Sequence, residues 1–444
     1  TTVPEGVKLD FAVTVNPITT GVSFEGNTVY TSEVLTKFMD IQPGQVLNSV
    51  YVGQKIQGIN AAYARDGYML AHVDGIRVDD QGMLHVHIVE GIVEDIIPAG
   101  NKKTRDKVIT REFVQKKGKP FNKFLVRRSV ERVYNLGFFD DVNVRMLPGD
   151  QDPNNVIIEI DVLEHKTGTI TLGAGYSKSD GLMGIIEFGE DNFRGTGDKF
   201  KVHWEIGGKK KYKNYQISYL KPWIDSKGTS LGFSFFNRED EYTDYNEDGN
   251  EVAEYNKKSR GFNISFGRQT GEYTRDYLTL ESRKDSYKWD DDDSSGFRYD
   301  KNAGKGKNWN NGSYNFANDK YVDKNFGRIN SITWQKVYDS RDNIYEPTRG
   351  RRISYTAQWA GHGLGGDFDF YKFTAEARMY KKLGAKNVLA FRARGGFIQG
   401  DAPYSQLFTL GGADSLRGYE DDQFRGKYMY NATLEFRFPI VKKV

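Results

Sequence analysis

A cation in a glycine-rich setting stands out near the end of the sequence. The stretch LFTLGGADSLRGYEDDQFRG runs from Leu407 to Gly426 and places Arg417 between a leucine and a glycine. Glycine lets a backbone bend sharply and approach a neighbour closely, so such a stretch can hold one guanidinium in a fixed position. A fixed guanidinium binds carboxylates through charge-assisted hydrogen bonds. The role of this arginine is open at this point, because no catalytic triad or phosphate-binding pattern lies nearby.

Patterns typical of enzymes and cofactor sites find little support elsewhere. Residues 361–366, GHGLGG, fit a dinucleotide-binding pattern, but strand-like residues follow them where a helix is required. His85 and His87 share one face of a predicted strand and could ligate a metal, yet no third ligand is nearby. The acidic stretches 246–254 and 289–296 lack the spacing of a calcium loop and indicate solvated charge, with calcium binding as the weaker alternative. We therefore expect no enzyme activity, no metal site and no cofactor.

The composition indicates which elements position Arg417. The 444 residues include 27 Tyr, 28 Phe and 48 Gly but no Cys, and the mean hydropathy is -0.66. A polar sequence rich in these aromatic residues and glycine suits a transmembrane β-barrel, whose strands show only every second residue to lipid. No apolar run approaches the ~18 residues of a membrane helix. The alternative is a large soluble all-β protein, and the net charge of +3 favours neither.

Residues 18–165 contain two copies of one repeat. Residues 22–38, VSFEGNTVYTSEVLTKF, correspond to residues 95–113, DIIPAGNKKTRDKVITREF, so that a Gly-Asn pair occupies equivalent positions in both. Apolar residues at intervals of three and four predict helices within each copy, and both copies end on alternating strand residues. The order predicted for each copy is strand, helix, helix, strand, strand.

From Lys166 onward the hydrophobic period becomes two. In FKVHWEIGG one face carries Phe200, Val202, Trp204 and Ile206, and the other carries Lys201, His203 and Glu205. About twelve strands of this kind follow one another, which is the alternation of half-buried strands. Short glycine-rich turns alternate with long polar connectors at 242–258, 289–325 and 401–426. Short turns on one rim and long loops on the other are typical of outer-membrane barrels.

Several stretches together carry a resemblance to a known family. The repeats resemble POTRA (polypeptide-transport-associated) domains, and residues 171–200, 337–355, 408–419 and 432–440 are similar to the barrels of the POTRA-plus-β-barrel superfamily, in particular its BamA-type outer-membrane protein assembly factors. The resemblance covers nearly the whole chain. Its most specific element is the LRGY segment, Leu416, Arg417, Gly418 and Tyr419, which matches the superfamily's Val/Leu-Arg-Gly-Phe/Tyr hallmark. A second element is the periplasmic turn motif, with Asp339, Arg341, Asp342, Pro347 and Gly350.

The resemblance implies an architecture of two α+β POTRA domains followed by an antiparallel transmembrane β-barrel. The expected boundaries are 1–17 for the last strand of a truncated preceding POTRA, seen in Val7–Pro17, 18–91 and 92–165 for the two POTRA domains, and 166–444 for the barrel. Family barrels have about 16 strands, within the range of bacterial outer-membrane barrels. We therefore expect the C-terminal strands to be missing from this sequence.

The resemblance also implies roles for individual residues. In the family the LRGY loop folds into the barrel, where its arginine acts as a latch, a contact that holds the loop on the inner wall. Glu435 is the matching wall residue, because alternation places Tyr430, Ala432, Leu434, Phe436 and Phe438 toward lipid and Asn431, Thr433, Glu435 and Arg437 toward the interior. The alternative for Arg417 is a solvated loop arginine. The first barrel strand would be a gate that opens laterally, with Thr171, Gly173, Gly175 and Tyr176 as its residues.

The function implied is that of an assembly factor that folds and inserts β-barrel proteins by strand addition at a lateral seam. It would lie in the outer membrane with its POTRA domains in the periplasm. The expected partners are unfolded outer-membrane proteins, accessory assembly lipoproteins or periplasmic chaperones, and outer-membrane lipids, but no nucleic acid. Two alternatives stay open, a two-partner secretion transporter and a TamA-like translocation and assembly factor.

Overall fold

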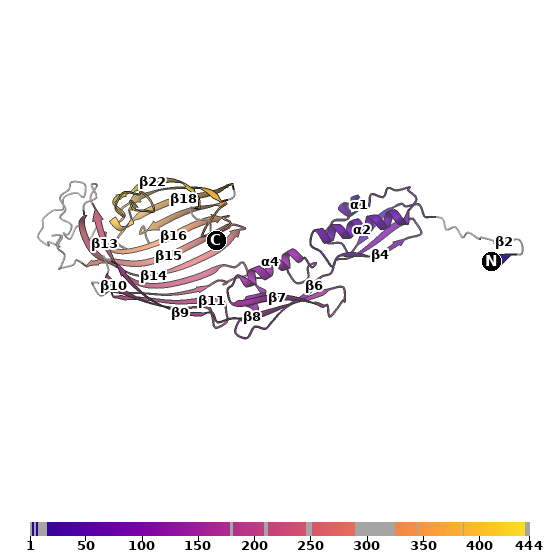
Figure 1. The fold of residues 1–444 in the computed structure, drawn as a ribbon, viewed down its shortest axis with the longest axis horizontal. Coiled ribbons are helices and arrows are strands. Elements are labelled where there is room, and N and C mark those ends of the chain that lie inside the picture. Colours follow the sequence, from indigo (N-terminus) through magenta and orange to yellow (C-terminus); the bar gives the residue numbers. More distant parts are fainter. Residues whose placement is uncertain are drawn as a thin grey trace. The chain divides into compact units, whose positions relative to one another are not determined.

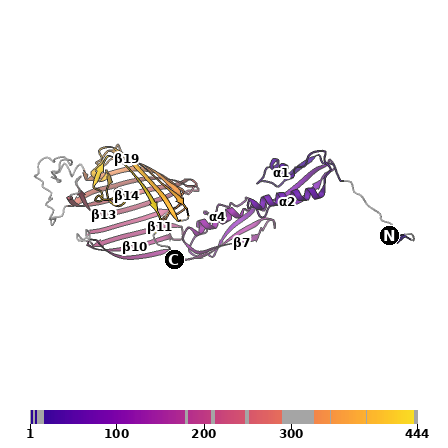
Figure 2. The same cartoon turned by 45° about the horizontal axis from the view of Figure 1, so that its top comes forward.

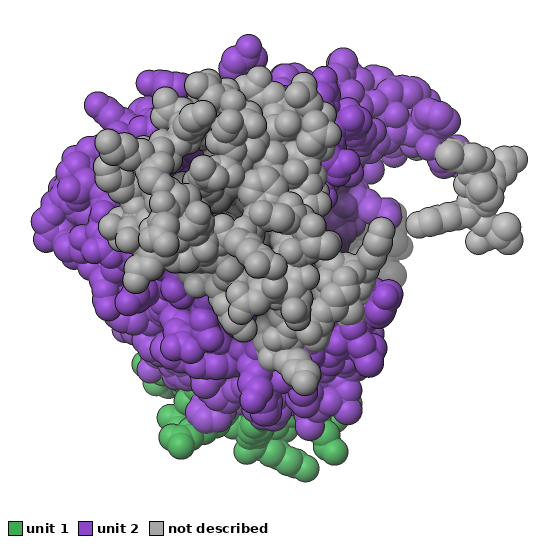
Figure 3. Space-filling model, turned by 90° about the vertical axis from the view of Figure 1, so that its left-hand side faces the viewer, with its two compact units in different colours: residues 1–167, 194–196 green, residues 168–193, 197–444 purple. Residues whose placement is uncertain are grey.

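The fold was analysed in a computed structural model, which describes residues 2–3, 6–7, 16–177, 181–207, 212–245, 251–288, 325–343, 345–384 and 386–439. The chain divides into two compact units, residues 1–167 with 194–196 and residues 168–193 with 197–444 (Figure 3). At the N-terminus, β1 (Thr2–Val3) pairs with β2 (Gly6–Val7). The strand expected over Val7–Pro17 lies mostly outside the described residues.

The first unit contains the two predicted repeats. The first copy consists of β3 (Gly21–Glu25), α1 (Ser32–Met39), α2 (Ser49–Arg65), β4 (His72–Val78) and β5 (Met83–Val89). The second consists of β6 (Val93–Ala99), α3 (Asp106–Thr110), α4 (Lys123–Tyr134), β7 (Phe139–Pro148) and β8 (Val156–Glu164). In both, the last strand lies in the middle of a three-stranded sheet, parallel to the first strand and antiparallel to the other (Figures 1 and 2). The predicted order of elements is confirmed.

The Gly-Asn pair builds the same turn in both copies. Gly26 has a φ of 83° and Gly100 a φ of 81°, a left-handed conformation that glycine adopts without strain. A Cβ on Gly26 would lie 2.1 Å from the carbonyl oxygen of Ile88, and one on Gly100 would lie 2.3 Å from that of Val162. The asparagine that follows donates its side-chain amide to the carbonyl three residues further on, at 2.8 Å and 2.7 Å. Both conformation and close approach therefore require glycine here.

In each copy one carboxylate accepts hydrogen bonds from the turn. It lies just past the middle strand in the first copy and at the end of the middle strand in the second. Glu90 accepts hydrogen bonds from the backbone N–H groups of Thr28 at 2.8 Å and Val29 at 2.9 Å. In the second copy Glu164 accepts from the backbone of residues 102–104 at 2.6 to 2.9 Å. Because each turn receives its carboxylate from its own copy, each repeat closes its own fold.

One asparagine joins the two copies. Asn122 caps α4 by accepting the N–H of Phe124 at 2.9 Å, and its amide donates to the carbonyl oxygen of Asp66, the residue after α2, at 2.9 Å. The neighbouring Lys123 N–H donates to the carbonyl oxygen of Gly67 at 2.9 Å. The end of one helix is therefore bonded directly to the start of the next repeat's helix.

The second unit is one antiparallel sheet of twelve strands, as predicted, and it curls strongly (Figures 1 and 2). In chain order the strands are β9 (Gly168–Ser177), β10 (Gly181–Phe193), β11 (Asp198–Gly207), β12 (Tyr212–Lys221), β13 (Ser230–Tyr245), β14 (Glu251–Gly271), β15 (Thr274–Lys288), β16 (Gly327–Asp339), β17 (Gly350–Ala360), β18 (Phe370–Leu383), β19 (Asn387–Gly400) and β22 (Tyr428–Arg437). Consecutive strands are neighbours, and β9 and β22 stand at the two ends of the order. Within the described residues these two end strands do not pair with each other.

The two faces of this sheet differ in polarity. Cross-strand pairing places Leu278, Trp334, Phe373, Phe397 and Tyr428 in one row on the outer face. Of these, Trp334 is 40% exposed and Tyr428 is 80% exposed. The inner face carries polar and charged residues, as the alternation of the sequence predicts. Within the described residues, no helix combines the length and apolar character needed to cross a membrane.

The connectors differ from the prediction at one point. The prediction of a long connector over 242–258 is wrong, because β13 continues to Tyr245 and β14 already begins at Glu251. The backbones of the two strands stay paired across this stretch, from Tyr242 with Tyr255 to Tyr245 with Glu251. Of the connector predicted over 289–325, residues 289–324 lie outside the described residues. The third, residues 401–426, is long as predicted and is called the late loop below.

Candidate site on the inner face of the sheet

The late loop contains its own short hairpin. It comprises η2 (Tyr404–Gln406), β20 (Phe408–Leu410) and β21 (Phe424–Gly426), and the LRGY segment lies between the two strands. The hydroxyl of Ser415 donates to the carbonyl oxygen of Gly411 at 2.6 Å. The N–H of Gly412 donates to the backbone carbonyl oxygen of Tyr419 at 3.1 Å. Gly412 also pairs with Leu416 as an isolated bridge. These local contacts give the segment its shape.

The predicted partners Arg417 and Glu435 are close together. Nη2 of Arg417 lies 3.8 Å from Oε1 of Glu435, and Nε donates to the carbonyl oxygen of Ala413 at 3.4 Å. The carboxylate has a nearer partner, because Nη2 of Arg437 lies 2.7 Å from its other oxygen. The Arg417 side chain is 79% exposed, so the shielding expected for the pair is not seen within the described residues. Its role as a latch stays a prediction.

Three other inner-face side chains bind the late loop through its backbone. The pairs are Lys372 Nζ with the carbonyl oxygen of Gln406 at 2.7 Å, Arg392 Nη1 with that of Asp414 at 3.2 Å, and Asn431 Nδ2 with that of Ser415 at 3.2 Å. The donors come from β18, β19 and β22. Sequence reasoning missed the first two, because alternation identifies inner-face residues but not which of them meet a loop.

A close backbone approach fixes the start of the loop. Phe408 is buried, at 3% exposure, and packs on the inner face. A Cβ on Gly396 would lie 2.5 Å from Cζ of Phe408 and 2.5 Å from the carbonyl oxygen of Phe373. The ammonium of Lys372 lies 4.8 Å from the centroid of the same ring, a cation–π contact. Only glycine leaves room for Phe408 at this position.

The turn motif between β16 and β17 is held by its own carboxylates. Asp339 accepts from Nε of Arg341 at 2.8 Å and from Nη2 at 2.7 Å, a two-bond pair. Asp342 accepts the backbone N–H groups of Thr348 at 2.9 Å and Arg349 at 3.1 Å. The hydroxyl of Thr348 and these N–H groups hold the pKa of Asp342 well below its usual range. The motif is therefore built as a rigid turn.

The two remaining residues of the motif also have structural roles. Pro347 is buried. Gly350 has a φ of 94°, and a Cβ there would lie 2.2 Å from the carbonyl oxygen of Ser340. All five predicted residues thus lie in or beside one turn, and a functional role for them stays a prediction.

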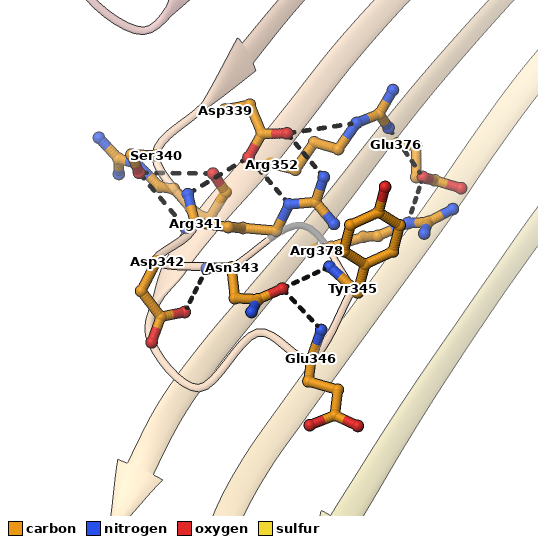
Figure 4. A network of polar contacts seen from close by, with 11 residues as sticks. Asp339, Ser340, Arg341, Asp342, Asn343, Tyr345, Glu346, Arg352, Glu376 and Arg378 are labelled. Carbon is orange, nitrogen blue, oxygen red and sulfur yellow. Dashed lines mark hydrogen bonds and ion pairs between the residues drawn. The ribbon is translucent and has the colours of Figure 1, made fainter. Parts of the chain in front are cut away.

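Glu376 of β18 stands at the centre of an ion-pair network. Its carboxylate accepts from Nε of Arg378 at 2.6 Å and from Nη2 of Arg392 at 2.9 Å, and Nη1 of Arg352 lies at 3.5 Å. Nε of Arg352 also lies 4.0 Å from Asp339 of the turn motif (Figure 4). The network crosses from β16 to β19, and nothing in the sequence spacing indicated it.

The predicted gate residues lie on β9. Thr171, Gly173 and Gly175 pair with Glu187, Ile185 and Met183 of β10, respectively. Tyr176 points to the outer face and is 77% exposed. A Cβ on Gly175 would meet nothing within 4 Å, so packing does not require glycine there. The gate role of this strand stays a prediction.

The other candidate sites form no centre. His85 binds Ser23 at 2.7 Å and Asp79 at 3.0 Å, whereas His87 lies 3.6 Å from Asp74. The two histidines thus have separate partners. Within the described residues no group of three or more His, Cys, Asp or Glu could hold a metal ion. The glycine-rich stretch 361–366 connects β17 with β18. Of the acidic stretch 246–254, residues 246–250 lie outside the described residues and the rest begins β14, and the stretch 289–296 lies wholly outside them.

Two POTRA-type repeats followed by a curled sheet with a polar inner face, an apolar outer face and an LRGY loop define a POTRA-plus-β-barrel protein. The family model described as "Omp85 superfamily domain" matches residues 192–444, and the POTRA model, "Surface antigen variable number repeat", matches residues 17–91 and 92–165. The chain belongs to the Omp85 superfamily. It is located in the outer membrane with its POTRA domains in the periplasm, as predicted.

Similar curated proteins are outer-membrane assembly factors and a chloroplast protein. The chain is 27% identical over 436 residues to "Outer membrane protein assembly factor BamA" of Nitratidesulfovibrio vulgaris, covering 94% of this chain and 50% of that protein. It is 24% identical to BamA of Neisseria meningitidis, covering 94% and 54%, and 24% identical to "Outer envelope protein 80, chloroplastic" of Oryza sativa, covering 94% and 62%. The chain thus spans about half the length of the BamA relatives it matches. The predicted BamA-type resemblance is confirmed.

Solved structures show the same fold. BamA from Haemophilus ducreyi lacking POTRA domains 1–3 matches with a TM-score of 0.62 at 21% identity, covering 96% of this chain and 84% of that one. CdiB from Escherichia coli matches with a TM-score of 0.64 at 14% identity, covering 99% and 80%. At these identities the likeness extends to the fold alone, so it does not distinguish between the activities of the two proteins.

Proposed function

We propose that the protein folds and inserts outer-membrane β-barrel proteins by pairing a client strand with the free edge of β9. The observation that carries the proposal is the strand order, in which β9 and β22 each have one neighbour within the described residues. A free strand edge presents unpaired N–H and C=O groups that template an incoming strand. Similarity to BamA assembly factors over 94% of the chain supports the same function.

The composition of β9 suits a strand that changes partners. Glycine weakens a strand interior because it provides no side chain to pack, and Gly173 and Gly175 lie in the middle of this strand. Backbone groups left unpaired in lipid cost several kcal/mol each, on the order of the penalty for burying a polar group. Pairing of a client strand removes that cost, so insertion proceeds downhill. We propose that it uses no catalytic residue and no nucleotide.

The proposed partners follow from the surfaces that the fold offers. The small sheets of the first unit have outer strands, β3 and β4 in one and β6 and β7 in the other, which offer edges to unfolded outer-membrane proteins, assembly lipoproteins or periplasmic chaperones. The apolar outer face of the large sheet offers a surface to outer-membrane lipids.

The test of the function uses the whole chain in phospholipid vesicles. A urea-unfolded outer-membrane β-barrel client is added, and its folding is followed by the change in gel mobility of unheated samples. We expect faster folding than in protein-free vesicles for several unrelated clients. Equal rates with and without the protein would refute the proposal.

Cross-linking tests the proposed edge. The chain has no cysteine, so Thr171→Cys on β9 introduces a single reactive thiol. We expect it to form a disulfide with a cysteine in a client strand during folding. Ser218→Cys is the matched control, because Ser218 lies on β12 and is paired on both sides. Equal cross-linking at both positions would exclude β9 as the specific edge.

The two-partner secretion transporter is the second candidate, because the fold shared with CdiB is compatible with it as well as with an assembly factor. Such a protein would carry one exoprotein into the vesicle interior and would not accelerate folding of unrelated barrels. A TamA-like factor is the third candidate and would differ in its clients. The choice of client in the vesicle assay therefore separates these functions.

A further inference from the structure

We infer that Arg392, held in place by Glu376, is a positioning residue that seats the LRGY loop on the inner face of the sheet. Only the assay of client folding described below rests on the proposed function. The geometry points to a second attachment of this loop, separate from the pair of Arg417 and Glu435.

The guanidinium of Arg392 divides its donors between the wall and the loop. Nε and Nη2 bind Glu376 at 3.1 Å and 2.9 Å, and Nη1 donates to the carbonyl oxygen of Asp414 at 3.2 Å. Asp414 lies two residues before Leu416, so this bond fixes the entry to the LRGY segment. The planar guanidinium presents its donors in a fixed fork. Orientation by Glu376 therefore aims the third donor at the loop.

Glu376 also makes the crowding of positive charge possible. Three guanidinium groups, those of Arg352, Arg378 and Arg392, lie within 3.5 Å of its carboxylate. The side chain of Glu376 is only 11% exposed, so solvent screens these charges less than at the surface. Without the carboxylate the arginines would repel one another, and Arg392 would lose its orientation.

Arg392 is better shielded than the predicted latch. Its side chain is 30% exposed and that of Glu376 is 11% exposed, whereas Arg417 and Glu435 are 79% and 33% exposed. The shortest distance is 2.9 Å in the first pair and 3.8 Å in the second. The bond that Arg392 makes to the loop itself, at 3.2 Å to the carbonyl oxygen of Asp414, is also shorter than the 3.8 Å between Arg417 and Glu435, and exposed ion pairs at longer distances contribute little.

The chain offers a matched control on the same strand. Arg394 also lies on the inner face of β19 and is directly opposite Glu376 in the strand register. Arg392 is opposite Arg378 instead, so its bond to Glu376 runs diagonally. Within the described residues Arg394 has no hydrogen bond to Glu376 or to the late loop. Arg394→Ala thus removes an equal charge from the same face without removing the attachment.

Spin labels measure the position of the loop directly. The labels are attached to Ala413→Cys in the loop and Met379→Cys on the outer face of β18, in the whole chain in vesicles. We expect a narrow distance distribution in the parent and in Arg394→Ala. In Arg392→Ala and Glu376→Gln we expect a broad distribution, with the seated fraction lowered about tenfold, the change that a loss of ~1.4 kcal/mol produces.

A conservative variant separates positioning from general stability. Arg392→Lys keeps the charge, but a single ammonium cannot replace the fork, so an intermediate distribution is expected. Gel mobility of unheated samples verifies that each variant is folded. A distribution in folded Arg392→Ala as narrow as that in the parent would overturn the inference, and so would equal broadening in Arg394→Ala.

Client folding in the same vesicles adds an independent readout. We expect a rate about tenfold lower in Arg392→Ala and unchanged in Arg394→Ala, again by the scale of one lost attachment. A broad distribution with an unchanged folding rate would still support the positioning role and would count against a part for the loop in the proposed function. The two failures are therefore distinguishable.

Discussion

Arg417 lies 3.8 Å from Glu435, but the same carboxylate is bound at 2.7 Å by Arg437, two residues further along β22. Glu435 therefore neutralises two cations at once, one from the sheet and one from the loop. Removal of its charge would leave both guanidinium groups facing each other.

Reversal of the Arg417 charge should impair client assembly. Arg417→Glu places two carboxylates together and frees the LRGY segment, and the second change Glu435→Arg should restore part of the activity. The folding rate of a client in vesicles measures both. Because an exposed pair contributes ~0 to 1 kcal/mol, the stability of the sheet should change little. Normal assembly by Arg417→Glu would refute the latch.

Gly396 should be the least tolerant glycine beneath the late loop. Gly396→Ala puts a Cβ 2.5 Å from both Phe408 and the carbonyl of Phe373, so the loop must shift. Overpacking of this kind typically costs ~1 to 3 kcal/mol. The neighbour Gly395 is the control, because a Cβ there meets only the carbonyl oxygen of Met429, at 3.6 Å. Thermal unfolding of the two variants should differ clearly, and equal midpoints would contradict the close approach.

Asn122→Ala should loosen the joint between the two POTRA domains. It removes a helix cap, which typically costs ~0.5 to 2 kcal/mol, and also the bond to the carbonyl of Asp66. Hydrogen exchange should therefore become faster near the end of α2. Asn48→Ala removes only the cap of α2 itself, by which Asn48 accepts from Val50 at 2.9 Å. Faster exchange near Asp66 in both variants would show that Asn122 has no special role there.

Acid should weaken the first unit through Glu164. Burial alone would raise the pKa of Glu164, but hydrogen bonds from the hydroxyl of Thr104 and from the backbone of residues 102–104 outweigh it and lower the pKa. A carboxyl whose pKa is lower in the folded state stabilises the fold above its unfolded value of about 4.3 and loses that contribution as the pH falls through the folded pKa. The free energy of unfolding should therefore decrease below about pH 4.3.

Glu164→Gln should make this pH dependence shallower. Urea unfolding followed by the helical circular dichroism signal measures it, because α1, α2, α3 and α4 all lie in the first unit. Glu131→Gln, at an exposed position on α4, is the control. The same dependence on pH in Glu164→Gln and in the parent would contradict a stabilising role for this carboxylate.

The sequence predicted the elements well wherever a pattern was repeated. Two copies of one arrangement revealed the POTRA order, and a hydrophobic period of two revealed twelve strands and their faces. The proximity of Arg417 to Glu435 was predicted from the alternation of side chains along the last strand together with a family resemblance. The connector over 242–258 was misjudged because polar composition alone does not separate a loop from a paired strand.

The ion-pair network was not predictable from the alternation of side chains along the strands. Alternation places Arg392, Arg394 and Glu376 on one face of the sheet but does not show which arginine binds the carboxylate. The register would have favoured Arg394, which is directly opposite Glu376, whereas the bond goes diagonally to Arg392. Side-chain reach and the position of the late loop decide this, and both depend on the folded sheet.

The late loop is attached through carbonyl oxygens of its backbone, at residues 406, 414 and 415. Every amino acid supplies that acceptor, so substitutions at residues 406 and 414 need not disturb the attachment, whereas Ser415 also shapes the loop through its hydroxyl. The donor side is restricted, since Lys372, Arg392 and Asn431 act through their side chains. During divergence, variation should therefore be tolerated at residues 406 and 414 of the loop, whereas the three donors on the wall beneath it should be retained.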